Sequence, residues 1–127
     1  TYRVYDYKRK DSEGNERELH TEEAKAAIDF NANNEYKVSY TSAENKKTAL
    51  VENEYFKTKE IKLTQSLSLD YSATDSFVIY MNIEGTTTVE VEGFTETLKL
   101  GETLLIPACF NEVKITSKNA TLLEVTI

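Results

Sequence analysis

The chain has 127 residues, a length that suits one domain able to bury about two-thirds of the surface that its unfolded form exposes. With 39% hydrophobic and 29% charged residues, its composition is that of a globular protein rather than a disordered one. The net charge of −7 argues against nucleic acid or an anionic membrane as the main partner, because both repel an acidic surface.

The sequence contains no run of about 18 apolar residues, so we expect no membrane-spanning helix. It also has no charged and then apolar leader of the kind that directs export. Cys109 is the only cysteine and cannot form a disulfide within the chain. Together these features predict a cytoplasmic protein.

Residues 1–34 are predicted to precede a barrel that occupies residues 35–127. Residues 1–7, TYRVYDY, are rich in aromatic and β-branched side chains, which favours a strand. A polar stretch follows, and Gly14-Asn15 within it predicts a turn. The sequence has no initiator methionine and begins inside the predicted strand, so we expect it to be a piece of a longer protein.

A short helix is predicted to follow Thr21, which suits the N-cap position. Glu22 and Glu23 would lie in its first turn, where the helix dipole favours negative charge. Because so short a helix is not stable alone, we expect it to pack on the barrel or on a neighbour. Its apolar stripe would consist of Ala24, Ala27 and Ile28.

The segment after the helix is predicted to contain an asparagine-rich turn from Asn31, a short strand over Tyr36 to Tyr40, and a polar connection that ends in Lys46-Lys47. Beyond it, apolar residues fall at odd positions, which predicts two strands that share one buried face. These residues are Val51, Tyr55, Ile61, Leu63, Leu67, Leu69 and Tyr71.

Alternation is clearest between Phe77 and Pro107, where it has the period of strands with one buried face. Gly85, Gly93 and Gly101 interrupt it at eight-residue intervals, which predicts turns because glycine readily adopts a positive φ. A short strand over residues 103–106 would end at the proline, which cannot donate to a ladder. The alternating residues are Phe77, Ile79, Met81, Ile83, Val89, Val91, Leu98 and Leu100.

Two more strands are predicted near the end of the chain, one through Val113 and Ile115 and one through Leu123, Val125 and Ile127. Eight or nine strands with one small helix indicate an all-β fold. The expected architecture is a jelly roll or closed antiparallel barrel, which leaves few exposed strand edges.

The order Glu84-Gly85, Gly93, Gly101 and Ile106-Pro107 resembles the core of the cupin barrel family. In metal-binding cupins, histidines and a glutamate follow the first of these strands, and another histidine follows the proline. This chain has no histidine after Gly85, and Ala108-Cys109-Phe110-Asn111 occupies the place of the last ligand. The resemblance therefore implies a barrel that lacks the metal site.

The head of the chain is similar to a segment of bacterial class I mannose-6-phosphate isomerases. With the degenerate cupin core behind it, the resemblance covers essentially the whole chain, and the head is its more specific part because many cupins share the glycine pattern. The matching residues are Thr1 to Tyr7, Arg9, Arg17-Glu18-Leu19-His20 and Ala27-Ile28-Asp29-Phe30.

This resemblance implies the C-terminal part of a zinc-dependent enzyme that interconverts mannose 6-phosphate and fructose 6-phosphate. The family's zinc ligands lie upstream of the matched segment, so it implies zinc in the parent protein and neither a cofactor nor activity in this chain. It also implies that Arg3 acts in the intact parent as a fixed cation that stabilises an oxyanion. The upstream catalytic domain would be the partner, and the sugar phosphate would bind only in the parent.

Other candidates for chemistry have simpler structural interpretations. His20 is the only histidine and cannot form a zinc site of three or four protein ligands, so its place before the helix predicts a structural role. Cys109 has no nearby histidine in sequence to activate it and is interpreted as a small buried hydrophobe. A solvated outer face is predicted for Glu84, Glu90, Glu92 and Glu96. Packing rather than sugar stacking is predicted for Tyr5, Tyr7, Tyr36, Tyr40 and Tyr80.

Two alternatives remain open from the sequence. One is a stand-alone cupin-like module that binds a carbohydrate or a protein without chemistry, which a start codon just before Thr1 would favour. The other is an independent metal-dependent cupin enzyme, which stoichiometric bound metal in the purified chain would favour.

Overall fold

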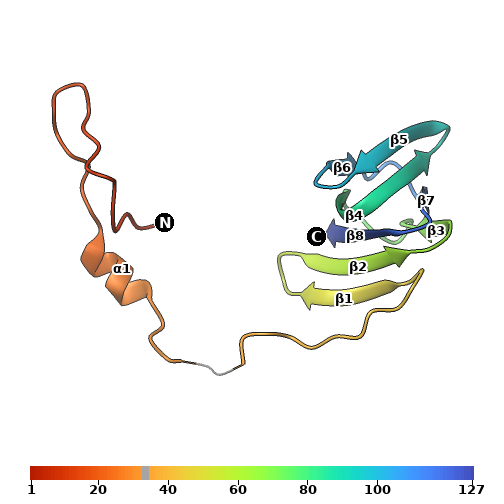
Figure 1. Cartoon of the computed structure of the whole chain (residues 1–127), viewed down its shortest axis with the longest axis horizontal. Coiled ribbons are helices and arrows are strands. Elements are labelled where there is room, and N and C mark those ends of the chain that lie inside the picture. Colours follow the sequence, from red (N-terminus) through yellow and green to blue (C-terminus); the bar gives the residue numbers. More distant parts are fainter. Residues whose placement is uncertain (33–34) are drawn as a thin grey trace. The chain divides into compact units, whose positions relative to one another are not determined.

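The computed structural model describes residues 1–32 and 35–127, which divide into two compact units, Thr1–Tyr36 and Lys37–Ile127 (Figure 1). Within these residues, the first unit holds helix α1 (Thr21–Ala27) and the second holds all the strands. The predicted asparagine-rich turn and the boundary after residue 34 fall on or beside residues 33–34, outside the described part, and stay predictions. None of the helices described has the length and apolar character needed to cross a bilayer.

In the first unit, residues 1–20 form two extended arms joined by a turn, and the strand predicted over residues 1–7 is wrong. The arms touch at only a few points, including a backbone hydrogen bond of 2.7 Å from His20 N to Arg3 O and an isolated bridge between Lys10 and Glu16. Tyr7 and Lys8 have φ of 53° and 55°, a left-handed conformation that interrupts the extended run before a ladder can form.

The helix is confirmed, but its cap is one residue earlier than predicted. His20 occupies the N-cap position and makes no side-chain capping bond, while Thr21 is already helical. Glu22 and Glu23 lie in the first turn as expected. Of the predicted apolar stripe only Ala24 is buried, since the helix ends at Ala27 and its C-cap, Ile28, is 53% exposed.

Eight antiparallel strands, counted over the described residues, curl into a half-barrel in the second unit (Figure 1). Their order is β1-β2-β8-β4-β7-β3, and β5 and β6 also pair with β4. The all-β prediction with one short helix is confirmed. The strands are β1 (Lys47–Glu52), β2 (Lys57–Leu63), β3 (Leu67–Asp70), β4 (Val78–Val91), β5 (Phe94–Lys99), β6 (Thr103–Ile106), β7 (Glu112–Thr116) and β8 (Ala120–Thr126).

The strand predicted over Tyr36 to Tyr40 is wrong, since these residues form no ladder and are exposed. Two strands were expected between residues 51 and 71, but three elements cover this region, β1, β2 and β3. The odd-position face holds for Ile61, Leu63 and Tyr71, which are buried, whereas Val51 and Tyr55 are exposed.

Strand β4 is the centre of the half-barrel because it pairs with four other strands. Its first part pairs with β6 and β8 and its second part with β5 and β7. The turn predicted at Gly85 is wrong, since β4 continues through this residue next to an irregularity in the register between Asn82 and Glu84. Gly93 and Gly101 do lie in turns, with φ of 85° and 82°.

The register irregularity also reverses which side chains of β4 face the core. Before it the buried residues are Val78, Tyr80 and Asn82, so the predicted burial of the face of Ile79, Met81 and Ile83 is wrong. After it the odd-numbered residues turn inward, and Thr87 and Val89 are buried. An extra residue in one strand shifts the alternation by one place, so no single phase fits the whole of β4.

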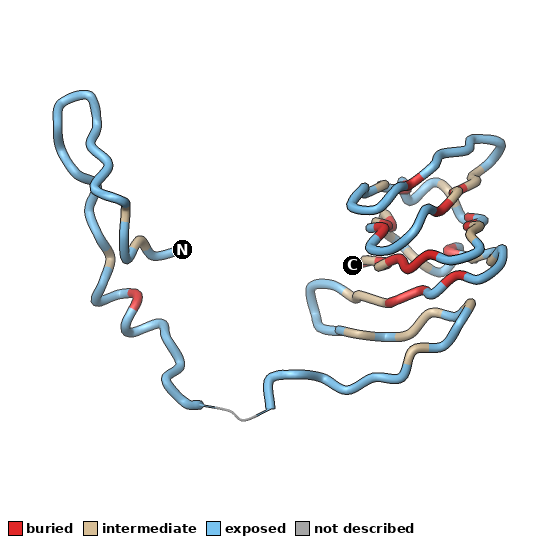
Figure 2. The backbone as a smooth tube through the Cα atoms, viewed as in Figure 1, coloured by how far each residue is buried: buried red, intermediate tan, exposed pale blue. Residues whose placement is uncertain are grey.

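The core of the second unit lies between the curled walls of the half-barrel. Figure 2 shows its buried residues strung along the strands, whereas the first unit is almost entirely exposed. The hydrophobic cluster consists of Ile61, Leu63, Tyr71, Val78, Tyr80, Val89, Leu98, Ile106, Val113, Ile115 and Leu122.

Candidate functional site

A polar cluster fills part of the interior of the half-barrel. Glu124 of β8 is 1% exposed, and its Oε2 accepts a hydrogen bond from the Tyr71 hydroxyl. That hydroxyl also contacts the hydroxyl of Tyr80 on β4. Lys47 of β1 places its Nζ 2.6 Å from Glu124 Oε2, while the Nζ of Lys59 on β2 is 3.9 Å from Oε1.

The electrostatics of this cluster favour neutral tyrosines around one ion pair. Burial, together with the neighbouring oxygens of Tyr80 and Glu124, raises the pKa of Tyr71 far above its ordinary value, and burial likewise raises the pKa of Tyr80. Burial lowers the pKa of Lys47, and the contact with Glu124 opposes that shift. The Nζ of Lys47 also lies 4.0 Å from the centroid of the Tyr71 ring.

The cluster is arranged for stability rather than for proton transfer. Both tyrosines keep their protons at neutral pH, and Glu124 is engaged by a lysine and a phenol. Among the described residues no buried side-chain nitrogen or oxygen lacks a partner. Sequence reasoning missed this cluster, although the alternation of β8, which puts Leu122 and Glu124 on one face, could have revealed it.

The polar cluster does not fit zinc. The inward side chains are tyrosines, a lysine and one glutamate already paired with that lysine, whereas zinc requires several free thiolate, imidazole or carboxylate donors. Within the part of the chain that the structure describes, no group of three His, Cys, Asp or Glu residues could hold a metal ion. Whether a parent protein carries zinc elsewhere is untouched by this observation.

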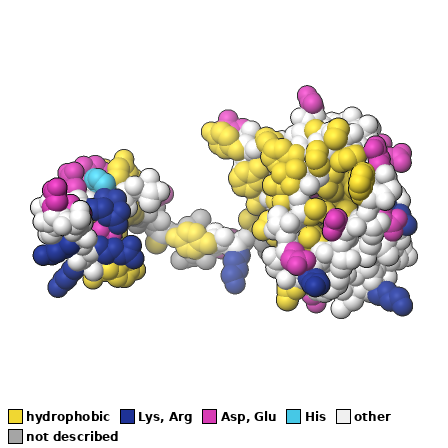
Figure 3. All heavy atoms as spheres, turned by 90° about the horizontal axis from the view of Figure 1, so that it is seen from above, with side chains coloured by type: hydrophobic (Ala, Val, Ile, Leu, Met, Phe, Trp, Pro, Cys, Tyr) yellow, Lys and Arg dark blue, Asp and Glu magenta, His cyan; other side chains and the backbone are white. Residues whose placement is uncertain are grey.

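An apolar cavity of about 270 Å³ opens beside the polar cluster, between β4, β5 and β6. Figure 3, which looks down on this part of the unit, shows hydrophobic side chains gathered there. Glu96 is the one ionisable group in the lining, so the cavity suits an apolar group better than a sugar phosphate. The lining residues are Val89, Val91, Phe94, Glu96, Leu104, Leu105, Ile106, Pro107 and Phe110.

A second hollow, of about 730 Å³, lies over β3, β7 and the turn from β4 to β5. Its lining includes Asp70, Glu90, Glu92 and Glu112, with Lys114 as its one cation. Lys114 is already paired with Glu90 at 3.0 Å. An acidic lining of this kind repels the phosphate group of a sugar phosphate.

Of the four glutamates of the predicted outer face, only Glu90 and Glu92 share a site, the second hollow. Glu84, Glu92 and Glu96 are exposed and Glu90 is half-exposed, as a solvated face requires. Glu84 accepts a hydrogen bond of 2.9 Å from Thr121 Oγ1. The interpretation of Cys109 as a buried hydrophobe is wrong, because this residue lies exposed in the turn after Pro107, which follows β6.

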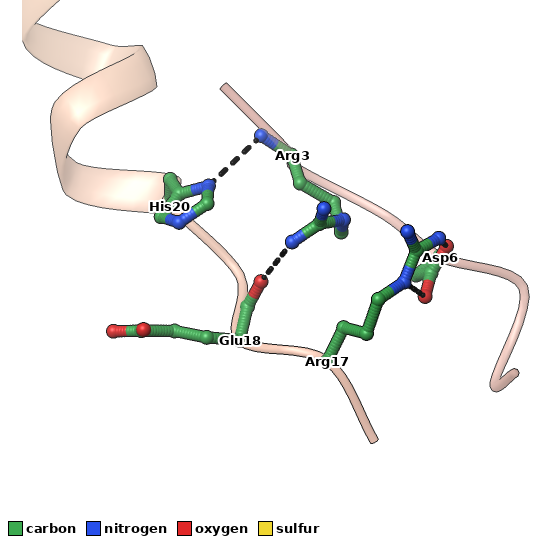
Figure 4. A network of polar contacts seen from close by, with 5 residues as sticks. All are labelled: Arg3, Asp6, Arg17, Glu18 and His20. Atoms are coloured by element: carbon green, nitrogen blue, oxygen red, sulfur yellow. Dashed lines mark hydrogen bonds and ion pairs between the residues drawn. The ribbon is translucent and has the colours of Figure 1, made fainter. Parts of the chain in front are cut away.

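Arg3, the predicted active-site cation, lies in the first unit (Figure 4). Its Nη1 donates a hydrogen bond of 2.9 Å to the Glu18 carbonyl oxygen, and its backbone N donates one of 3.3 Å to His20 Nδ1. His20 thus ties the two arms together at the start of the helix, and Tyr2 packs edge-on against its ring at 6.3 Å between centroids. The catalytic role of Arg3 remains a prediction.

A second cross-link in the same unit joins Asp6 to Arg17 through two hydrogen bonds, one of them 2.8 Å from Arg17 Nε to Asp6 Oδ2 (Figure 4). The hydrogen bond from Arg17 and its positive charge hold the pKa of Asp6 below its ordinary value. Bidentate pairing of this kind fixes the geometry of both side chains.

We expect NMR titration of Asp6 to give a pKa below the ordinary value of about 3.9. Because the pKa of Asp6 is lower in the folded state, its contact with Arg17 stabilises the two arms fully when the pH is above the ordinary pKa of Asp. This stabilisation is lost as the pH falls through the folded-state pKa. Arg17→Gln should raise the pKa of Asp6 back toward the ordinary value. Arg9→Gln, the control, should change it less, because the charge of Arg9 is the weakest influence on Asp6. An Asp6 pKa indifferent to Arg17→Gln would contradict the pairing.

The half-barrel is that of a cupin. It superposes on a cupin-2 domain-containing protein from Shewanella frigidimarina with a TM-score of 0.57 and 15% identity, covering 67% of this chain and 82% of that one. The profile of the family described as mannose-6-phosphate isomerase, cupin domain, matches residues 46–126, and the chain belongs to this family.

The similarity extends to a specific relative. The chain is 32% identical over 117 residues to mannose-6-phosphate isomerase ManA of Bacillus subtilis, a match that covers 91% of this chain and 36% of that protein. The crystal structure of the mannose 6-phosphate isomerase from Bacillus subtilis superposes with a TM-score of 0.70, covering 99% of this chain and 40% of the other. The chain therefore spans well under half the length of this relative and corresponds to its C-terminal part.

Proposed function

We propose that this chain is the C-terminal cupin domain of a zinc-dependent mannose-6-phosphate isomerase and that its task there is structural. The observation that carries this proposal is the 32% identity with a protein of that name over nearly the whole chain. The polar cluster supports a structural task, because Glu124 is buried and paired with Lys47 rather than free to act on a substrate.

In the parent, the interconversion of mannose 6-phosphate and fructose 6-phosphate would take place on an upstream domain. Zinc held there would polarise the sugar carbonyl. The one contribution of this chain to the chemistry would be Arg3. Its guanidinium donates one hydrogen bond to the Glu18 carbonyl oxygen, and its other N–H groups would donate to an oxyanion of the substrate.

The partners follow from the same proposal. The chain would bind the upstream domain, and the sugar phosphate would bind only to the assembled protein. Neither nucleic acid nor a membrane is a partner in this proposal, in keeping with the net charge of −7. The cytoplasm is the proposed compartment, where the exposed thiol of Cys109 would stay reduced.

The test is complementation with the separately expressed upstream part of the same gene. We expect no isomerisation of mannose 6-phosphate by this chain alone and recovery of turnover in the mixture. Turnover by the chain alone, or tightly bound zinc within it, would overturn the proposal. A mixture without turnover would favour a stand-alone binding module.

The role of Arg3 has its own prediction in the assembled protein. Arg3→Gln should lower kcat by about 10²-fold, the usual cost of removing one charge-stabilising donor from an active site. Arg9→Gln, which replaces an exposed arginine on the same arm, should leave kcat within about twofold of the parent. An equal effect of the two substitutions would argue that Arg3 only stabilises the first unit.

A further inference from the structure

The outward face of β4, β6 and β8 is apolar where a solvated sheet would be polar. In the register of the sheet, Ile79 lies opposite Leu105 on one side and Val125 on the other, and Met81 lies opposite Leu123. Cross-strand partners point to the same face. These five residues therefore form one continuous patch, here called the outer stripe.

The outer stripe remains accessible in this chain. Leu105 is 52% exposed and Met81 is 39% exposed, while Ile79, Leu123 and Val125 are half-buried. The margin of the stripe is polar. Thr103 of β6, which is exposed, lies opposite Met81, and the exposed Glu84 follows the register irregularity of β4. An apolar centre with a polar rim is the usual anatomy of a protein interface.

The first half of β4 has the pattern of a strand that is covered on both faces. An antiparallel strand with one solvated face alternates apolar and polar residues, whereas a strand buried on both faces is apolar throughout. Residues 78–83, VIYMNI, are of the second kind except at Asn82, which faces inward. Strand β7 of the same unit differs from β4 in this respect, because its outward residues are the exposed Glu112 and Lys114.

We propose that the outer stripe is the surface on which the upstream domain of the parent protein packs, an inference that rests on the proposed function. The occupant follows from chain length. The chain covers 36% of the Bacillus subtilis relative and corresponds to its C-terminal part, so the larger share of such a protein precedes it. A domain of that size can cover a stripe that spans three strands.

Thiol labelling of single-cysteine variants tests this proposal. In a Cys109→Ser background, Met81→Cys probes the stripe, and Thr97→Cys on β5 probes an exposed position of another strand. We expect both thiols to react at comparable rates in the chain alone. After addition of the upstream part, labelling of Met81→Cys should slow by about tenfold or more, and that of Thr97→Cys should not change.

A second measurement uses binding affinity. Met81→Lys with Val125→Lys should weaken association with the upstream part by about tenfold or more, because a charge at the centre of an apolar interface is left unpaired. Leu100→Lys, which replaces a 66% exposed apolar side chain outside the stripe, should leave it within about twofold. Circular dichroism verifies that each variant is folded.

The outcomes separate this inference from the proposed function. A complex that restores turnover while Met81→Cys stays fully reactive would overturn the docking surface and leave the function intact. No complex and no turnover with the unmodified chain would overturn both. Protection of Met81→Cys in the chain alone, increasing with concentration, would show that a second copy covers the stripe and would overturn the upstream domain as its occupant.

Discussion

Gly85→Ala is expected to destabilise the second unit by about 4 kcal/mol or to prevent its folding. Two effects add up at this residue. Its φ of +70° costs an L-residue about 1–2 kcal/mol, and an added Cβ would lie 2.1 Å from the backbone oxygen of Asn119. The clash is with backbone rather than a flexible side chain, so β4 and β8 would have to separate where they pair. Urea unfolding followed by circular dichroism measures the loss.

Gly93→Ala is the matched control, because Gly93 has a φ of +85° and nothing within 4 Å of an added Cβ. It should cost only the backbone term, about 1–2 kcal/mol. If Gly85→Ala does not fold, the comparison still holds, since Gly93→Ala should give soluble protein with a cooperative transition. Equal losses for the two substitutions would show that the close approach of β8 has no energetic consequence.

This pair of glycines illustrates what the sequence could and could not predict. Turns at Gly93 and Gly101 were predictable because glycine followed by a new alternating run is a local signal. Gly85 has the same local sequence pattern, but it lies within β4 and not in a turn. Its positive φ occurs beside the register irregularity of β4, where the strand passes close to Asn119. That requirement arises from a partner 34 positions further along the chain, which no local pattern reveals.

The alternation of β4 shows the same limit. Both faces of its first half are apolar, so periodicity alone could not decide between the face of Tyr80 and that of Met81. A run that is apolar on both faces was itself the informative signal, since it pointed to burial on both sides. The strand predicted over residues 1–7 was wrong for a different reason. A composition that favours strands cannot compensate for the lack of a neighbouring strand with which to pair.

The polar cluster was the least predictable part of the candidate site. Its members come from β1, β2, β4, β8 and the residue after β3, and they meet only because the half-barrel curls. Because Lys47 lies at the end of a polar run, the sequence predicts that its side chain is solvated. Glu124 stands among apolar residues in β8, and a charge on the buried face of a strand requires a partner, which is the one local hint the sequence contained.

Glu124→Ala is therefore expected to destabilise the second unit by about 3 kcal/mol, since removing one member of a buried ion pair leaves the other uncompensated. The Tyr71 hydroxyl would also lose its acceptor. Chemical unfolding at pH 7 measures this loss.

Two measurements test whether Lys47 is the charge that Glu124→Ala leaves unpaired, one by varying the pH and one by a compensating substitution. Without Glu124, the pKa of Lys47 should fall further, because burial already lowers it and the opposing carboxylate is gone. Between the lowered pKa and the ordinary value of about 10.4, the folded state then binds fewer protons than the unfolded state. The stability of Glu124→Ala should therefore rise with pH across that window. The rise should end at about pH 10, where tyrosine begins to ionise in the unfolded chain.

Glu124→Leu combined with Lys47→Met should recover most of the loss at pH 7, since an apolar pair of similar volume can replace a buried ion pair. A double variant as unstable as Glu124→Ala would show that the carboxylate acts mainly through Tyr71 and Tyr80 rather than through the lysine.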